Sequence, residues 1–199
     1  IVNEGGWNIA GANDGIGITG VAYDANIMPI RVLNDNGSGY LSDVTAGIRF
    51  AADNNADVIN LSLGGGGYNS SMYEAIQYAS ELGSVVVMAS GNEYATTPGY
   101  PAYYSIDYGL AVGAVDINFD MANFSNKAGN IVLDYVTAPG VDIYSSLIGG
   151  GYGIYSGTSM AAPHIAGIAG LLRSYDNDLT AYEIESLISS SGENSVTFT

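Results

Sequence analysis

The sequence of 199 residues contains no cysteine, one histidine, and only four lysine and arginine residues. The lack of cysteine excludes disulfides, thiolate catalysis and cysteine-based zinc sites. A single histidine excludes a zinc site built from several imidazoles. The scarcity of basic residues argues against nucleic acid and anionic membranes as partners, because lysine and arginine must neutralise their phosphates. No apolar run reaches the roughly 18 residues of a membrane span, so no membrane partner is expected.

Acidic residues are plentiful, with 20 aspartates and glutamates and a formal net charge of −16. Such a charge is typical of a well-solvated surface. It also suits Ca²⁺, which binds carboxylate and carbonyl oxygens, and both interpretations remain open here. Hydrophobic residues make up 47% of the chain and charged residues 12%. With this length, the composition predicts one globular domain over residues 1–199 with a sizeable core.

Apolar segments and helical periodicity alternate along the chain. Runs with few charges at 57–63, 84–89 and 109–115 are typical of strands buried on both faces of a parallel sheet. A further strand is predicted at 26–33, short strands at 136–139 and 143–147, and helices before, between and after these segments. Alternating strands and helices predict βαβ units with right-handed crossovers, and therefore an α/β fold with a mostly parallel sheet.

Helix starts are marked by capping residues. Ser42 is expected to cap the first helix, and Ser70 or Ser71 the second. Thr180 and Glu183 have the spacing of a capping box at the start of the last helix. These positions fix the predicted helix boundaries.

The segment at 157–164 reads Gly-Thr-Ser-Met-Ala-Ala-Pro-His and lies between a glycine-rich turn and an apolar helical run. It places Ser159 in the first turn of a buried helix, where backbone N–H groups are unpaired and the helix dipole favours negative charge. The small neighbouring residues leave room for a substrate carbonyl. This setting favours a serine nucleophile whose attack creates an oxyanion.

This octapeptide resembles the nucleophile motif of the subtilisin-like serine proteases (subtilases), with Ser159 as the matching serine. Further segments match the same family in the same order, so the similarity runs from about residue 9 to about residue 190. The resemblance implies a three-layer αβα fold and hydrolysis of peptide bonds through an acyl-enzyme on Ser159. It also implies that Asn92 donates its side-chain amide to the oxyanion, beside the backbone N–H of Ser159.

The same resemblance implies a groove for an extended peptide that adds like an edge strand. Its lining is expected to be Ser62, Leu63 and Gly64 on one wall, Ala89, Ser90 and Gly91 on the opposite wall of the primary specificity pocket, and Gly99 at the pocket base. Gly99 would leave room for large apolar side chains. The Tyr100–Pro101 bond that follows is cis in relatives. Each segment taken alone also fits an ordinary strand-to-loop turn.

A glycine-rich loop at 12–18 contains one carboxylate. Such a loop can direct carbonyls at a hard cation, although an Asn-Asp-Gly turn alone also explains it. The stretch resembles the calcium loop of bacterial calcium-dependent subtilases. The resemblance implies a structural Ca²⁺ bound by the side chain of Asp14 and the carbonyls of Ala12, Ile16 and Ile18.

A serine nucleophile needs a histidine base, which an aspartate in turn orients. The single histidine, His164, lies five residues after Ser159 on the predicted helix and projects roughly 140° away from it at ~100° per residue. It is therefore expected to pack on a helix face. The His-Gly-Thr-His segment that subtilases carry before the calcium loop is absent from this sequence, as is the Asp-Ser/Thr-Gly setting of the catalytic aspartate.

Three hypotheses remain open. In the first, the chain is the carboxyl-terminal part of a serine endopeptidase whose amino-terminal part, with the Asp and His segments, is missing or separately encoded. In the second, it is a non-catalytic pseudoprotease or peptide-binding module. In the third, it is an acidic structural protein. The first two imply a peptide or protein partner, and the first also a missing amino-terminal segment or propeptide. The resemblance implies an extracellular location.

Overall fold

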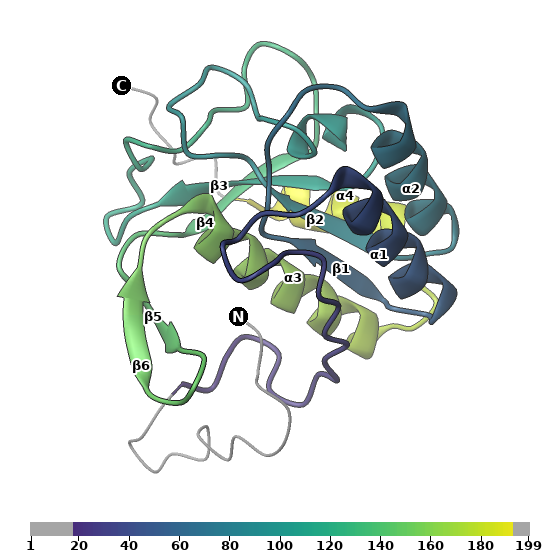
Figure 1. Ribbon diagram of the computed structural model, residues 1–199, viewed down its shortest axis with the longest axis horizontal. Helices are drawn as coiled ribbons and strands as arrows, with labels where there is room; N and C mark the ends of the chain where they lie inside the picture. The colour runs from purple at the N-terminus through teal and green to yellow at the C-terminus, as the bar shows by residue number, and fades with distance from the viewer. Residues whose placement is uncertain (1–17, 193–199) are drawn as a thin grey trace.

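The computed structural model describes residues 18–192 (Figure 1). Its centre is a parallel sheet whose spatial order follows the chain: β1 (Val58–Leu61), β2 (Val85–Ala89), β3 (Leu110–Val115) and β4 (Tyr135–Pro139). An antiparallel hairpin of β5 (Ile143–Ser146) and β6 (Tyr152–Tyr155) projects from one side of the sheet. The structure confirms the predicted α/β fold with a mostly parallel sheet.

Helices cover both faces of the sheet. One face packs against α1 (Leu41–Asp53), α2 (Ser70–Glu81) and the short 3₁₀-helix η1 (Ala102–Ile106), and the other against α3 (Thr158–Tyr175) and α4 (Ala181–Ser191). Strand β2 shows how this division arises. Its side chains are buried and alternate between the two cores, because successive residues of a strand point to opposite faces. The predicted three-layer arrangement is therefore confirmed.

Two of the three predicted helix caps are wrong. Tyr40 precedes α1, which has no side-chain cap, and Ser42 lies inside the helix. Asn69 caps α2, because its backbone is extended and its Oδ1 accepts an N–H of the first turn at 3.0 Å. The serines that follow it are already helical. The capping box of Thr180 and Glu183 at the start of α4 is confirmed.

The predicted strand at 26–33 is also wrong, because this segment belongs to no strand. Its alternation does place Ile30 and Val32 against the core beneath α1, while Ile27 and Met28 are exposed. A strand also requires a partner for its backbone groups, and β1 pairs only with β2 in the described sheet. In the part of the chain that the structure describes, no helix has the length and apolar character needed to cross a bilayer.

Candidate functional site

The start of α3 is bonded to the end of β1 through two serines. Ser159, the second residue of α3, donates its hydroxyl to the carbonyl of Ser62 at 3.3 Å. In return, the Ser62 hydroxyl donates to the Ser159 carbonyl at 2.9 Å. Pro163 explains this second bond, because it has no N–H to donate to the carbonyl four residues earlier in the helix. The two bonds fix Ser159 at the carboxyl end of the sheet, where ligands of parallel α/β folds gather.

Asn92 lies beside the start of the same helix. Its Oδ1 accepts the backbone N–H of Thr158 at 2.9 Å and the Thr158 hydroxyl at 3.1 Å. The Thr158 hydroxyl oxygen in turn accepts the N–H of Gly91 at 3.1 Å. With its carbonyl oxygen occupied, Asn92 keeps its NH₂ group free of partners among the described residues. The N–H of Ser159 lies in the first helical turn, where α-helices leave donors unpaired. The structure therefore holds the Asn92 amide against Thr158, the residue directly before Ser159.

Asn126 holds the loop that follows β2, and sequence reasoning missed it. This side chain is 2% exposed and makes four hydrogen bonds. Its Oδ1 accepts the N–H groups of Glu93 at 3.0 Å and Ala95 at 2.9 Å, and its Nδ2 donates to the Ser90 carbonyl at 3.0 Å and to Glu93 Oε2 at 2.8 Å. Gly91 must be glycine here, since its φ is +108° and a Cβ would lie 2.3 Å from Asn126 Nδ2.

The sequence contains a signal for the role of Thr158 but none for that of Asn126. Thr158 lies inside the nucleophile motif, directly before the serine, so a role in positioning its neighbours could have been predicted. Asn126 lies in a loop outside every motif named above. Only the folded chain shows that its side-chain amide hydrogen-bonds the backbone N–H and C=O groups of the loop after β2.

The residues predicted to line the groove lie at the carboxyl ends of two adjacent strands. Residues 62–64 follow β1 and residues 89–91 end β2, and these strands pair in register. Gly99 donates its N–H to the Ser90 carbonyl at 2.8 Å, and Gly65 donates to the Tyr100 carbonyl at 3.1 Å. The Tyr100–Pro101 bond is cis, as the resemblance implied. The structure thus brings both predicted walls and the predicted pocket base together.

His164 lies on α3 one turn beyond Met160, and its ring Nδ1 lies 2.8 Å from the Met160 carbonyl. The Ser159 hydroxyl is bonded to a backbone carbonyl instead. Within residues 18–192, no cluster of three or more histidine, cysteine, aspartate or glutamate side chains forms a metal site. Of the predicted calcium ligands, Asp14, Ala12 and Ile16 lie outside the described residues, and Ile18 is the first described residue, in no helix or strand.

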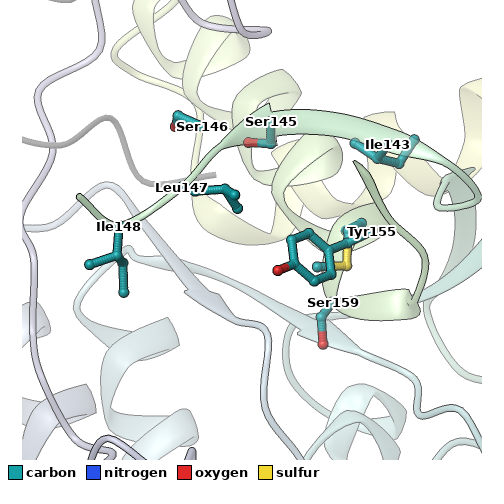
Figure 2. A pocket seen from close by; sticks show the side chains of 8 residues that line it. Ile143, Ser145, Ser146, Leu147, Ile148, Tyr155 and Ser159 are labelled. Atoms are coloured by element: carbon teal, nitrogen blue, oxygen red, sulfur yellow. The ribbon is translucent and has the colours of Figure 1, made fainter. Parts of the chain in front are cut away.

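A hollow of about 250 Å³ lies between the β5–β6 hairpin and the start of α3 (Figure 2). Its lining is mostly apolar and consists of Ile143, Ser145, Ser146, Leu147, Ile148, Tyr155, Ser159 and Met160. The Ser159 side chain points away from the hairpin side chains in Figure 2, in agreement with its bond to the end of β1. The sequence did not predict this hollow, because β6 was not predicted.

The carboxyl with the largest pKa change lies at the other end of the sheet. Burial, and then the charge of Asp134, raise the pKa of Glu185 on α4 to about 7. The backbone N–H groups of Gly109 and Val86 act in the opposite direction. Since these residues precede or begin strands, Glu185 lies at the amino ends of the sheet, away from Ser159.

This sequence and fold are similar to those of known proteins. The model of the subtilase family matches residues 5–197. Thermitase of Thermoactinomyces vulgaris is 49% identical over 162 residues, covering 81% of this chain and 56% of thermitase. The thermophilic serine proteinase of Bacillus sp. (strain AK1) is 45% identical, covering 87% of this chain and 43% of that protein. The chain thus spans about half the length of these relatives.

Solved structures give the same result. A cold-adapted subtilisin-like serine proteinase superposes with a TM-score of 0.83 at 37% identity, over 92% of this chain and 67% of that protein. Sphericase superposes with a TM-score of 0.70 at 33% identity, over 80% of this chain and 57% of that protein. Both the sequence and the fold are therefore similar to those of known serine proteinases.

Proposed function

Because this chain belongs to the subtilase family, we propose that it forms the part of a serine endopeptidase that supplies the nucleophile, the oxyanion donors and the peptide groove. Residues 1–199 make up one peptidase domain in this proposal. Ser159 Oγ attacks the carbonyl of the scissile peptide bond, an acyl-enzyme forms as the amine leaves, and water then releases the acyl group.

The observation that carries this proposal is the orientation of the Asn92 amide, whose oxygen is bonded to Thr158 at the start of α3. The Asn92 Oδ1 accepts two hydrogen bonds from Thr158, and its NH₂ group, which has no partner in the described part of the chain, can donate to developing negative charge. The unpaired N–H of Ser159 provides the second donor. Removing one such side-chain donor costs about 10²–10³ in turnover, a range that comes from subtilisin, which belongs to this same family. An acidic structural protein would have no need of this arrangement.

The substrate in this proposal is an extended peptide or protein segment. Its backbone pairs with Ser62, Leu63 and Gly64, as an added strand pairs with a sheet edge. The side chain before the scissile bond enters the pocket formed by Ala89, Ser90 and Gly91 with Gly99 at its base. A Cβ on Gly99 would lie 3.7 Å from the nearest atom, so the pocket is open at that position. The protein acts outside the cell, and the loop at 12–18 binds a structural Ca²⁺.

The general base must come from residues other than the single histidine, because His164 is bonded to the Met160 carbonyl. We therefore expect this chain alone to hydrolyse peptides no faster than its Ser159→Ala variant. The second candidate function is a peptide-binding module without catalysis. It is favoured by the bond from the Ser159 hydroxyl to the Ser62 carbonyl, which does not activate the hydroxyl.

A fluorophosphonate probe and a fluorescent extended peptide test both candidates on the chain as it stands. Binding of the peptide without labelling of Ser159 is the expected result. Labelling that disappears in Ser159→Ala would show that a base is present and would contradict the expected inactivity. Absence of both binding and labelling would contradict the groove itself. The coding sequence upstream and around Asn8–Ile9 then separates the candidates, since a His-Gly-Thr-His segment there favours the enzyme.

A further inference from the structure

The glycine-rich loop at 64–67 has almost no packing of its own. Gly65 and Gly66 have φ values of +133° and +74°, and a Cβ added at Gly65, Gly66 or Gly67 would meet no atom within 4 Å. Glycine also loses the most conformational freedom on ordering. The shape of this loop must therefore be set by the groups that hold its two ends.

Tyr104 holds the far end of the loop. Its hydroxyl accepts the backbone N–H of Asn69 at 2.8 Å and donates to the backbone carbonyl of the same residue at 2.9 Å. Asn69 also caps α2. The hydroxyl thus pairs the N–H of Asn69 and adds a second donor to its carbonyl, which also accepts the Tyr73 N–H of α2 at 3.0 Å. Tyr104 itself is 4% exposed and belongs to η1, so it is a rigid anchor.

The near end of the loop is held by neighbours of Tyr104. Gly65 donates to the Tyr100 carbonyl at 3.1 Å. The ring of Tyr68, the residue directly after the loop, lies edge-on to those of Tyr100 and Tyr104, with centroids 6.2 Å and 5.9 Å apart. The rings of Tyr100 and Tyr104 lie 4.9 Å apart. Edge-on aromatic pairs of this kind add specific attraction to apolar burial.

We propose that Tyr104 is a positioning residue that sets the width of the peptide groove. It connects the loop that continues the wall at 62–64 to the segment that forms the pocket base around Tyr100, so the two cannot move apart independently. This inference rests on the proposed function, because the groove is a peptide site only there. A ligand that extends along the wall depends on this connection, whereas a ligand that enters only the pocket does not.

The experiment compares Tyr104→Phe with Tyr73→Phe. Tyr73 belongs to the same ring cluster, with its centroid 5.5 Å from that of Tyr104, but its hydroxyl bonds the side chain of Asp107. Both changes remove one phenolic oxygen. The two probes are an acetylated hexapeptide amide of five alanines and a terminal phenylalanine, and acetyl-phenylalanine amide. Dissociation constants come from NMR titration of the chain with each probe.

Tyr104→Phe should raise the dissociation constant of the hexapeptide about tenfold, the effect of roughly one or two lost hydrogen bonds. It should leave that of acetyl-phenylalanine amide within about twofold, since this ligand does not reach the wall. Tyr73→Phe should change neither. Equal weakening of both probes, an unchanged hexapeptide affinity in Tyr104→Phe, or the same effect in Tyr73→Phe would overturn the inference.

Amide hydrogen exchange gives a second measurement that needs no ligand. Exchange at residues 64–69 should rise about tenfold in Tyr104→Phe and stay unchanged in Tyr73→Phe, because local opening becomes easier when an anchor is lost. Unchanged exchange in Tyr104→Phe would overturn the inference even if peptide binding changed. If the unmodified chain binds neither probe, the proposed function fails and the groove role of Tyr104 fails with it.

Discussion

The two ends of the parallel sheet differ in the polar groups that they contain and in how these groups are hydrogen-bonded. At the carboxyl ends, Thr158 and Asn126 hydrogen-bond the loop after β2, and the NH₂ group of Asn92 has no partner within residues 18–192. At the amino ends, the carboxyl of Glu185 is 5% exposed and its Oε1 has no hydrogen-bond partner among the described residues. One end is built from neutral donors held in place, and the other contains a buried acid.

This difference shows that a shifted pKa does not by itself locate the functional site. Perturbed ionisable groups often mark active sites, but here the carboxyl with a pKa near 7 lies against α4, and the candidate nucleophile has no titrating neighbour among its bonded contacts. Donors directed at developing charge need not titrate at all. The candidate site is therefore recognised from geometry.

The largest effect is expected at the carboxyl ends. Asn126→Leu removes four hydrogen bonds and leaves buried backbone groups unpaired, so we expect a loss of about 4 kcal/mol in the free energy of unfolding. Urea unfolding followed by circular dichroism measures it. Asn118→Leu, at an exposed loop position, is the matched control and should change stability by less than about 0.5 kcal/mol. A loss below about 1 kcal/mol for Asn126→Leu would show that this network is dispensable.

At the amino ends of the sheet, the Glu185 carboxyl should make the free energy of unfolding depend on pH. Because the folded-state pKa of Glu185 is about 7 against an ordinary 4.5, folding favours the protonated acid. Its contribution to stability is fully present below pH 4.5, falls as the pH rises to about 7, and stays lost above that. The total is about 3 kcal/mol. Glu185→Gln should therefore stabilise the chain at pH 8 by up to this amount and flatten its pH profile, measured by urea unfolding from pH 4 to 9.

Glu183 is the control for that experiment. It lies on the same helix, and the N–H and hydroxyl of Thr180 lower its pKa. Its contribution is therefore present above its ordinary pKa and lost as the pH falls, so Glu183→Gln should destabilise the chain at neutral pH. A Glu185→Gln variant that loses stability at every pH would contradict the assignment of a buried protonated acid.

A smaller effect tests how Asn92 is oriented. Thr158→Val removes the hydroxyl that donates to Asn92 Oδ1 and accepts from Gly91. We expect a loss of about 1–2 kcal/mol in stability. Thr158→Ser retains the hydroxyl and should recover most of it. Equal losses for the two variants would mean that the methyl group, and not the hydrogen bonds, carries the contribution.

The smallest expected effect is that of calcium. If the loop at 12–18 binds Ca²⁺, millimolar calcium should raise the melting temperature by about 3 °C, and EDTA should reverse the rise. Differential scanning fluorimetry measures both. Asp14→Asn should abolish the response, because it removes the one carboxylate of the loop. A response that persists in Asp14→Asn, or an unchanged melting temperature in the unmodified chain, would count against this ligand set.

The sequence predicted most of the fold and the main motif of the site, for a physical reason. Buried strands such as β2 and β3 and the helix beginning at Thr158 are determined by local patterns and by short-range caps. The segment at 26–33 has the alternation of a strand, but pairing depends on a distant partner that no local pattern reveals. Asn126 is likewise invisible in the sequence, since its role arises from contacts with residues more than thirty positions away.

The paired bonds between Ser62 and Ser159 join residues 97 positions apart in the chain. Between them lie all three connections of the four-stranded parallel sheet and the whole β5–β6 hairpin. Contacts of such long range cost loop-closure entropy before they contribute to stability. The contacts around Ser159 therefore require that the sheet and the helix α3 are folded together. A chain cut anywhere between these two serines should lose this site unless its pieces reassemble.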